Sequence, residues 1–114
     1  MTYKEIRANE EVNALLDKGN KNLGLLGFTD HSKAHCTHVA ETAGHILKKC
    51  NYDAHDIELA KIAGYMHDIG NAINRTHHAE YGSLLANEIL RCSDLSAQDR
   101  ITIVSAIANH DEST

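Results

Sequence analysis

The stretch that decides the fold is residues 54–71, AHDIELAKIAGYMHDIGN. At 100° per residue, its apolar side chains cover most of the helix circumference instead of one stripe. These side chains are Ile57, Leu59, Ala60, Ile62, Ala63 and Met66. A helix that is apolar nearly all round is buried at the centre of a domain. The sequence therefore predicts a central helix that carries His67 and Asp68 at its end.

Four further helical segments are predicted around this one from hydrophobic period and capping residues. Asp53, Thr76 and Ser96 are the expected N-caps, and Gly70 is expected to close the central helix. The first segment is expected to be polar and peripheral, followed by a break over residues 19–27. No stretch alternates like a strand, so we predict an all-α fold, a compact bundle of about five helices. The expected limits are 3–18, 29 or 30–49, 53–69, 76–91 and 96–109 or 110.

Composition narrows the class of protein. A chain of 114 residues is one domain, with its core expected over residues 29–112. The absence of proline suits a mostly helical chain, and a net charge of −5 argues against a long nucleic acid as partner. Three cysteines without a C-x-x-C pair favour a reducing, cytoplasmic setting over a disulfide framework. No apolar run reaches the ~18 residues of a membrane span, and no signal peptide is evident.

Histidine is the one unusual count, with nine in the chain. Helical spacing directs four of them inward, one from each of four predicted helices: His35, His67, His78 and His110. His35 lies at the inner edge of an apolar arc, whereas the other histidines of its helix are expected to face solvent. The residues of that arc are Val39, Ala43, Ile46, Leu47 and Cys50, and the solvent-facing histidines are His31, His38 and His45.

A lone inward histidine is most often a hydrogen-bonded core residue, and Asp68 alone could be a helix-end charge. Asp111 is expected to be polar surface. Four inward imidazoles beside one carboxylate would each need a buried partner of their own, so together they favour a metal site. Such a donor set suits Fe, Mn, Co, Ni or Zn, with Mg not distinguished, and one or two divalent ions are expected.

Four runs carry a family resemblance: HCTHVAETA (35–43), GYMHDIGN (64–71), HHAEYGSLL (77–85) and IANHDE (107–112). Over residues 31–112 they resemble the HD-domain superfamily of metal-dependent phosphohydrolases. The resemblance implies an all-α fold with a mono- or binuclear metal centre between helices. By position, it implies that His35, His67 and Asp68 are metal ligands of the H…HD pattern. It further implies that His78 and His110 are the ligands found in variants with a second metal.

Two positions depart from the pattern. Asn71 stands where many relatives carry a lysine that can contact phosphate. The closing aspartate of the pattern lies on a later helix, whereas this sequence ends at Thr114, and Asp111 is too near His110 to be assumed its replacement. The chain is then a shortened version, has a partner that supplies the missing helix, or holds its metal with fewer ligands. A face left uncovered at this end predicts a homo-oligomer.

The activity that this reading implies is hydrolysis of a phosphate ester, a nucleotide or another small phosphorylated molecule, by a metal-activated water. Asp68 and His67 are the predicted catalytic residues, with Asp68 bridging two ions. Arg75 and Lys33 are candidate phosphate-binding residues, although either could be a solvated surface charge. The alternatives are a non-catalytic metal-binding or regulatory domain and a helical bundle that acts only through protein contacts.

Overall fold

The central apolar segment forms helix α4 (Ala54–Met66), which packs along α3 (Lys33–Lys49) and also contacts α1 and α6. The computed structural model describes residues 1–27 and 33–110, and these contain six α-helices, one 3-10 helix and no strand. The predicted all-α fold class is therefore confirmed, with one helix more than expected. The other elements are α1 (Tyr3–Arg7), α2 (Glu10–Leu25), η1 (Ile69–Ala72), α5 (His78–Arg91) and α6 (Ala97–Ala108).

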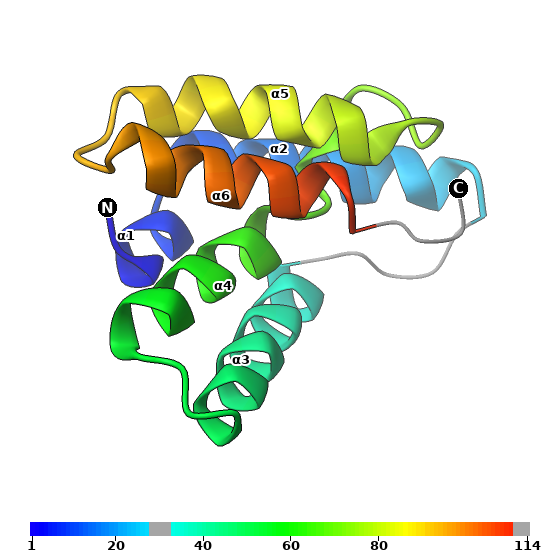
Figure 1. Cartoon of the computed structure of the whole chain (residues 1–114). Helices are drawn as coiled ribbons and strands as arrows, with labels where there is room; N and C mark the ends of the chain where they lie inside the picture. Colours follow the sequence, from blue (N-terminus) through cyan, green and yellow to red (C-terminus); the bar gives the residue numbers. More distant parts are fainter. Residues whose placement is uncertain (28–32, 111–114) are drawn as a thin grey trace.

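The helices form two groups (Figure 1). One is a three-helix layer made of α2, α5 and α6, with η1 packed between α2 and α5. The other is a two-helix arm made of α3 and α4, which joins the layer where α4 packs against α6. The chain passes from the arm to the layer at the end of α4, through His67 and Asp68 into η1. The predicted chemistry thus falls at the junction of the two groups.

At this junction, two glycines allow neighbouring backbones to come close together. A Cβ on Gly64 would lie 2.9 Å from the Cα of Ala40, so the glycine lets α4 approach α3. A Cβ on Gly70 would lie 1.8 Å from the carbonyl oxygen of His78, so η1 lies directly against the start of α5. Large apolar side chains that are almost fully buried fill the space around these contacts: Ile62, Met66, Ile69, Leu90, Ile103 and Ile107.

The predicted N-terminal helix over 3–18 is wrong. The chain turns at Ala8, and the Asn9 side chain caps a second helix by accepting from the amide of Val12. That helix continues through Gly19 to Leu25. Glycine at position 19 does not mark a break but a close approach of η1, because an added Cβ would lie 3.0 Å from Cβ of Asn71. Nor is the segment peripheral, since its buried side chains join the core. These are Tyr3, Ile6, Val12 and Leu16.

Other boundaries shift for local reasons. Helix α4 ends at Met66 and not at Ile69, and Gly70 lies inside η1 and does not close α4. The N-cap of α5 is His77, with a left-handed φ of 60°, in place of Thr76. The predicted N-caps Asp53 and Ser96 are confirmed by side-chain bonds to the amides of residues 56 and 99.

The apolar arc of α3 is centred differently from the prediction. Ile46 is 55% exposed and Cys50 is exposed, while Cys36, Ala40 and Gly44 form the buried stripe. The helix meets its neighbours mainly along α4, so only a narrow stripe of small residues is covered. The expected start of this helix at residue 29 or 30 lies outside the described residues. None of the described helices is long and apolar enough to cross a bilayer.

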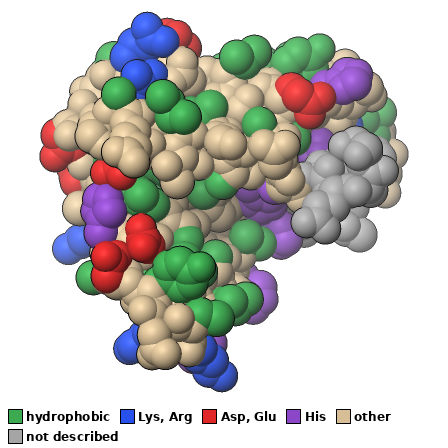
Figure 2. Space-filling view, in the orientation of Figure 1, with side chains coloured by type: hydrophobic (Ala, Val, Ile, Leu, Met, Phe, Trp, Pro, Cys, Tyr) green, Lys and Arg blue, Asp and Glu red, His purple; other side chains and the backbone are tan. Residues whose placement is uncertain are grey.

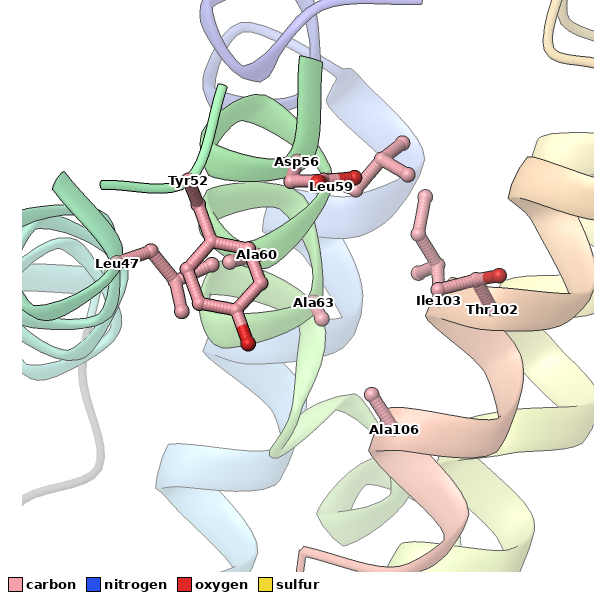
Figure 3. Close-up of a pocket in the computed structure, with 9 residues that line it drawn as sticks. All are labelled: Leu47, Tyr52, Asp56, Leu59, Ala60, Ala63, Thr102, Ile103 and Ala106. Carbon is pink, nitrogen blue, oxygen red and sulfur yellow. The ribbon is translucent and has the colours of Figure 1, made fainter. Parts of the chain in front are cut away.

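An apolar cleft of about 260 Å³ opens between the arm and α6 (Figure 3). The cleft is open because the side chains on both sides are small, among them Ala60 and Ala63 of α4 and Ala106 of α6. Tyr52 and Leu47 border it at the end of α3. None of the side chains that line it belongs to the residues predicted to bind metal or substrate, so this cleft is separate from the candidate site.

Candidate metal centre

Asp68 lies at the junction between the arm and the layer, with only 4% of its surface exposed. It follows α4 by two residues and precedes η1, so its carboxylate is fixed by two packed elements. A buried carboxylate is stable only when positive charge or hydrogen-bond donors surround it. Histidine side chains gather in the hollow where the arm meets the layer (Figure 2). Four imidazoles lie within 4 Å of the carboxylate of Asp68.

The arm contributes two of these imidazoles. Nε2 of His67 lies 3.2 Å from Oδ2 of Asp68, and Nε2 of His35 lies 3.8 Å from the same oxygen. His35 lies near the start of α3, and His67 follows the end of α4. The two residues come close to each other because these helices run side by side. The three ligand atoms lie within 4.8 Å of one another, close enough to hold one metal ion.

The layer contributes two more imidazoles, which face the other carboxylate oxygen. Nε2 of His78 lies 3.6 Å from Oδ1 of Asp68, and Nε2 of His110 lies 3.9 Å from it. His78 begins α5 and His110 follows α6, and these helices pack against each other. These three groups form a second set that could hold a metal. Asp68 is shared by both sets, with one oxygen facing each.

Backbone carbonyls fix the orientation of three of the rings. Nδ1 of His67 donates to the carbonyl of Gly64 at 2.6 Å, and Nδ1 of His110 donates to the carbonyl of Ile107 at 2.6 Å. Nδ1 of His78 donates to the carbonyl of Arg75 at 3.1 Å. A carbonyl can only accept, so the hydrogen of each neutral ring is on Nδ1 and the lone pair is on Nε2. This is the arrangement by which proteins orient metal-ligating histidines.

The ligand atoms from the layer repel one another unless a cation lies between them. Nε2 of His78 and Nε2 of His110 lie 3.2 Å apart. Since both rings carry their hydrogen on Nδ1, two lone pairs face each other with a carboxylate oxygen beside them. Three acceptors that converge in this way need a positive charge between them. Imidazole nitrogen and carboxylate oxygen are ligands suited to first-row transition metals.

The surroundings shift the pKa of two cluster histidines in opposite directions. Burial lowers the pKa of His78, and the positive charge of Arg75 lowers it further. Burial also lowers the pKa of His67, but the hydrogen bond and charge of Asp68 outweigh it, so the pKa of His67 lies above its ordinary value. His78 is therefore held in the neutral, ligating form, whereas positive charge is favoured where His67 meets the carboxylate.

The two predicted phosphate-binding cations lie in different places. Nη1 of Arg75 donates to Oδ1 of Asn71 at 3.3 Å, and its charge reaches both His67 and His78. Lys33 forms an exposed ion pair with Asp17 of α2 at 3.7 Å. Arg75 is therefore beside the cluster, and Lys33 is engaged at the surface between α2 and α3.

The surface positions predicted for the other histidines of this region and for Asp111 can be compared with the structure only where it describes them. His38 and His45 are exposed, as predicted. His31 and Asp111 lie outside the described residues.

Sequence reasoning missed the backbone carbonyls that orient the rings. Each carbonyl lies three residues before its histidine, and this regular spacing in residues 64–67, 75–78 and 107–110 is a signal that could have found them.

Asn71 is the other residue that sequence reasoning passed over, noting it only as a departure from the family pattern. It is 2% exposed, and its Nδ2 has no hydrogen-bond partner among the described residues. Its backbone amide donates to the carbonyl of Asp68 at 3.1 Å, so it is tied to the cluster.

Comparison with known proteins agrees with this geometry. Residues 33–114 match the family model of the HD domain, and the chain therefore belongs to the HD-domain family. Proteins of this family generally bind divalent metals and are generally hydrolases. The uncharacterized protein MJ1020 of Methanocaldococcus jannaschii is 31% identical over 105 residues, an alignment that covers 79% of this chain. The chain spans 40% of the length of that relative. No solved structure matches the chain.

Proposed function

We propose that this HD-domain chain is a metal-dependent phosphohydrolase that cleaves a small phosphate ester, such as a nucleotide. The observation that carries the proposal is the division of Asp68, whose Oδ1 and Oδ2 each face a separate pair of imidazoles. A carboxylate that bridges two cations in this way is typical of sites that hydrolyse phosphate esters. Membership of a family whose proteins are generally hydrolases supports the same activity.

Under this proposal, His35 and His67 would hold one divalent ion with Oδ2 of Asp68, and His78 and His110 would hold a second with Oδ1. When bound, such ions neutralise charge on phosphoryl oxygens and lower the pKa of an attacking water. Asp68 would hold both positive charges close together, and His67 keeps its Nε2 directed at the carboxylate because its Nδ1 hydrogen is donated to the carbonyl of Gly64.

Arg75 is the proposed phosphate-binding cation. Its guanidinium presents several N–H groups in a plane that matches two phosphate oxygens. Asn71 holds that guanidinium on the side of the cluster by accepting from Nη1. Lys33 contributes less in this proposal, since a phosphate would first have to displace its ion pair with Asp17.

The test combines metal analysis of the purified full chain with hydrolysis of a panel of phosphate monoesters and diesters in the presence of Mn²⁺. Asp68→Asn keeps the shape of the side chain but removes its charge. It is expected to lower both metal content and hydrolysis by more than about 100-fold, beyond the loss typical of an outer partner. Asp56→Asn, at an exposed position on α4, is the matched control and should behave as the wild type.

Two outcomes would contradict the proposal. Bound metal without turnover of any ester would support the non-catalytic metal-binding domain. A chain that binds no metal, and whose Asp68→Asn variant is as stable as the wild type or more so, would support a bundle that acts only through protein contacts.

A further inference from the structure

A second pocket lies beside the cluster, between the end of α2 and the turn that follows η1. Its cavity volume is about 280 Å³, at the lower limit for small-molecule sites and enough for a single ring system. Leu25, Leu26 and Ile73 give it apolar walls, and all three are exposed large hydrophobic residues. Exposed apolar side chains gathered around a cavity indicate a surface that binds something.

The pocket also has a polar edge. Asn71 lines it, and the Nδ2 donor of this buried side chain has no hydrogen-bond partner among the described residues. A buried donor without an acceptor costs free energy, so a shift of this side chain toward a ligand acceptor in the pocket would be favoured. Asn22 and Asn74 add two more amide side chains to the lining. Nδ2 of Asn22 already donates to the carbonyls of Asn71 and Ala72, and Oδ1 of Asn74 accepts from the amide of Thr76, so Oδ1 of Asn22 and Nδ2 of Asn74 are the groups left for a ligand. Amides offer both a donor and an acceptor, so this edge can recognise a group with mixed hydrogen-bonding atoms.

Two contacts tie the pocket to the cluster. Asn71 donates its backbone amide to the carbonyl of Asp68, and the carbonyl of Arg75 accepts from Nδ1 of His78. Both Asn71 and Arg75 line the pocket. A molecule in the pocket and a phosphate at the cluster would thus both lie near Arg75.

We propose that this pocket binds the flat heteroaromatic group of the substrate, such as a nucleobase, while the phosphate lies at the cluster. The inference rests on the proposed hydrolase function. A flat ring matches the apolar walls with its faces and the amide groups with its edge. A planar guanidinium also stacks on such rings. A hydrocarbon chain would leave the amides unpaired, and a sugar would leave the apolar walls uncovered.

The test uses the metal-free full chain and adenosine, which carries the ring but no phosphate. Adenosine is titrated while the side-chain amide signals of the protein are followed by NMR. Saturable shifts of the Asn71, Asn22 and Asn74 amides are expected, and ribose 5-phosphate should not reproduce them. Ile73→Asp places a carboxylate in the apolar wall and should weaken adenosine binding by about tenfold or more. Leu84→Asp, at an exposed apolar position of α5 outside the pocket, should leave binding unchanged.

Neither metal nor phosphate takes part in this titration, so its outcome is independent of hydrolysis. Adenosine binding without hydrolysis of any ester would contradict the proposed function and leave the pocket. Hydrolysis without saturable adenosine binding would overturn the pocket and leave the function. The pocket is also overturned if Ile73→Asp binds adenosine as well as Leu84→Asp does, or if octanoate shifts the same amides and adenosine does not.

Discussion

The three-helix layer and the two-helix arm both supply imidazoles to Asp68, but these imidazoles differ in how far they are exposed to solvent. In the layer, the His78 side chain is 6% exposed, and its Nε2 lies within 3.2 Å of Nε2 of His110. In the arm, His35 is 37% exposed, and its Nε2 lies 3.8 Å from the carboxylate. The second ring of each half narrows this contrast, since His67 of the arm is 15% exposed and His110 of the layer is 22% exposed. The arm half is therefore the more open one only at His35. Under the proposed function, ions and substrate would therefore reach Asp68 past His35.

The largest expected effect tests how tightly each region is packed. Gly70→Ala would bring a Cβ to 1.8 Å from the backbone of α5 in the layer, whereas Gly64→Ala would bring one to 2.9 Å from α3 in the arm. We expect Gly70→Ala to lower the free energy of unfolding by about 3 kcal/mol or more, and Gly64→Ala by about 1–2 kcal/mol. Urea unfolding followed by circular dichroism measures both.

Gly24→Ala is the control for these two variants. It is also a helical glycine, but its added Cβ would meet nothing within 4 Å. It should stabilise the chain by about 0.5–1 kcal/mol, the usual gain of alanine over glycine in a helix. Equal losses for the Gly64 and Gly70 variants would show that the layer is no more rigid than the arm.

The second prediction separates the two halves of the cluster. His35→Ala should remove the ion of the arm, weakening its binding by more than about 100-fold, and leave the ion of the layer resistant to a chelator. His78→Ala should do the reverse, leaving one ion that a chelator removes quickly. Metal analysis before and after dialysis against a chelator gives both results. His45→Ala, an exposed histidine of α3, is the control. Loss of all metal in both variants would mean that the halves are not separable.

The smallest effect concerns an ion pair between the two regions. Nε2 of His55 in α4 lies 2.9 Å from Oδ2 of Asp99 in α6. The hydrogen bond and charge of Asp99 raise the pKa of His55, with smaller contributions from Asp53 and Asp56. A raised pKa means that the stabilisation is fully present below the unfolded pKa of about 6.5 and is lost as pH rises through the folded value.

His55→Gln should therefore lower Tm slightly at about pH 5.5 and have less effect at about pH 8.5, since His55 is exposed and the pair is screened. Thermal unfolding of wild type and variant at both pH values measures the difference. His38→Gln, at an exposed position of α3, is the control variant. A His55→Gln effect that grows with pH would contradict the assignment.

The sequence predicted the parts of the fold that depend on local pattern. The all-round apolar character of residues 57–66 identified the central helix, and helical spacing selected His35, His67, His78 and His110. It did not predict the turn at Ala8, because the cap at Asn9 is a single-residue signal inside a polar stretch. Gly19 resembles a break until its contact with Asn71 is known, so tertiary packing overrides local propensity there.

The candidate site was predictable in its members and not in its arrangement. Periodicity shows that a side chain points inward, but it does not show where separate helices converge. Which oxygen of Asp68 faces which pair depends on how the arm and the layer pack together, and the periodicity of single helices does not specify that. The buried donor of Asn71 could not be inferred either, since its burial follows from the approach of α2 at Gly19.

The hydrogen bonds from ring to carbonyl have a consequence for how this protein can change. His67 and His110 stand where α4 and α6 stop, and the last carbonyls of any helix lack an amide from the next turn. The carbonyl of Ile107 accepts the backbone amide of His110 as well as its ring, whereas the carbonyl of Gly64 accepts from the Nδ1–H of His67, so at the end of α4 helix termination and ligand orientation are one feature of the chain. An insertion that prolonged α4 would offer the carbonyl of Gly64 a backbone amide and release the ring at the same moment. The length of α4 is thereby constrained by coordination chemistry as much as by packing.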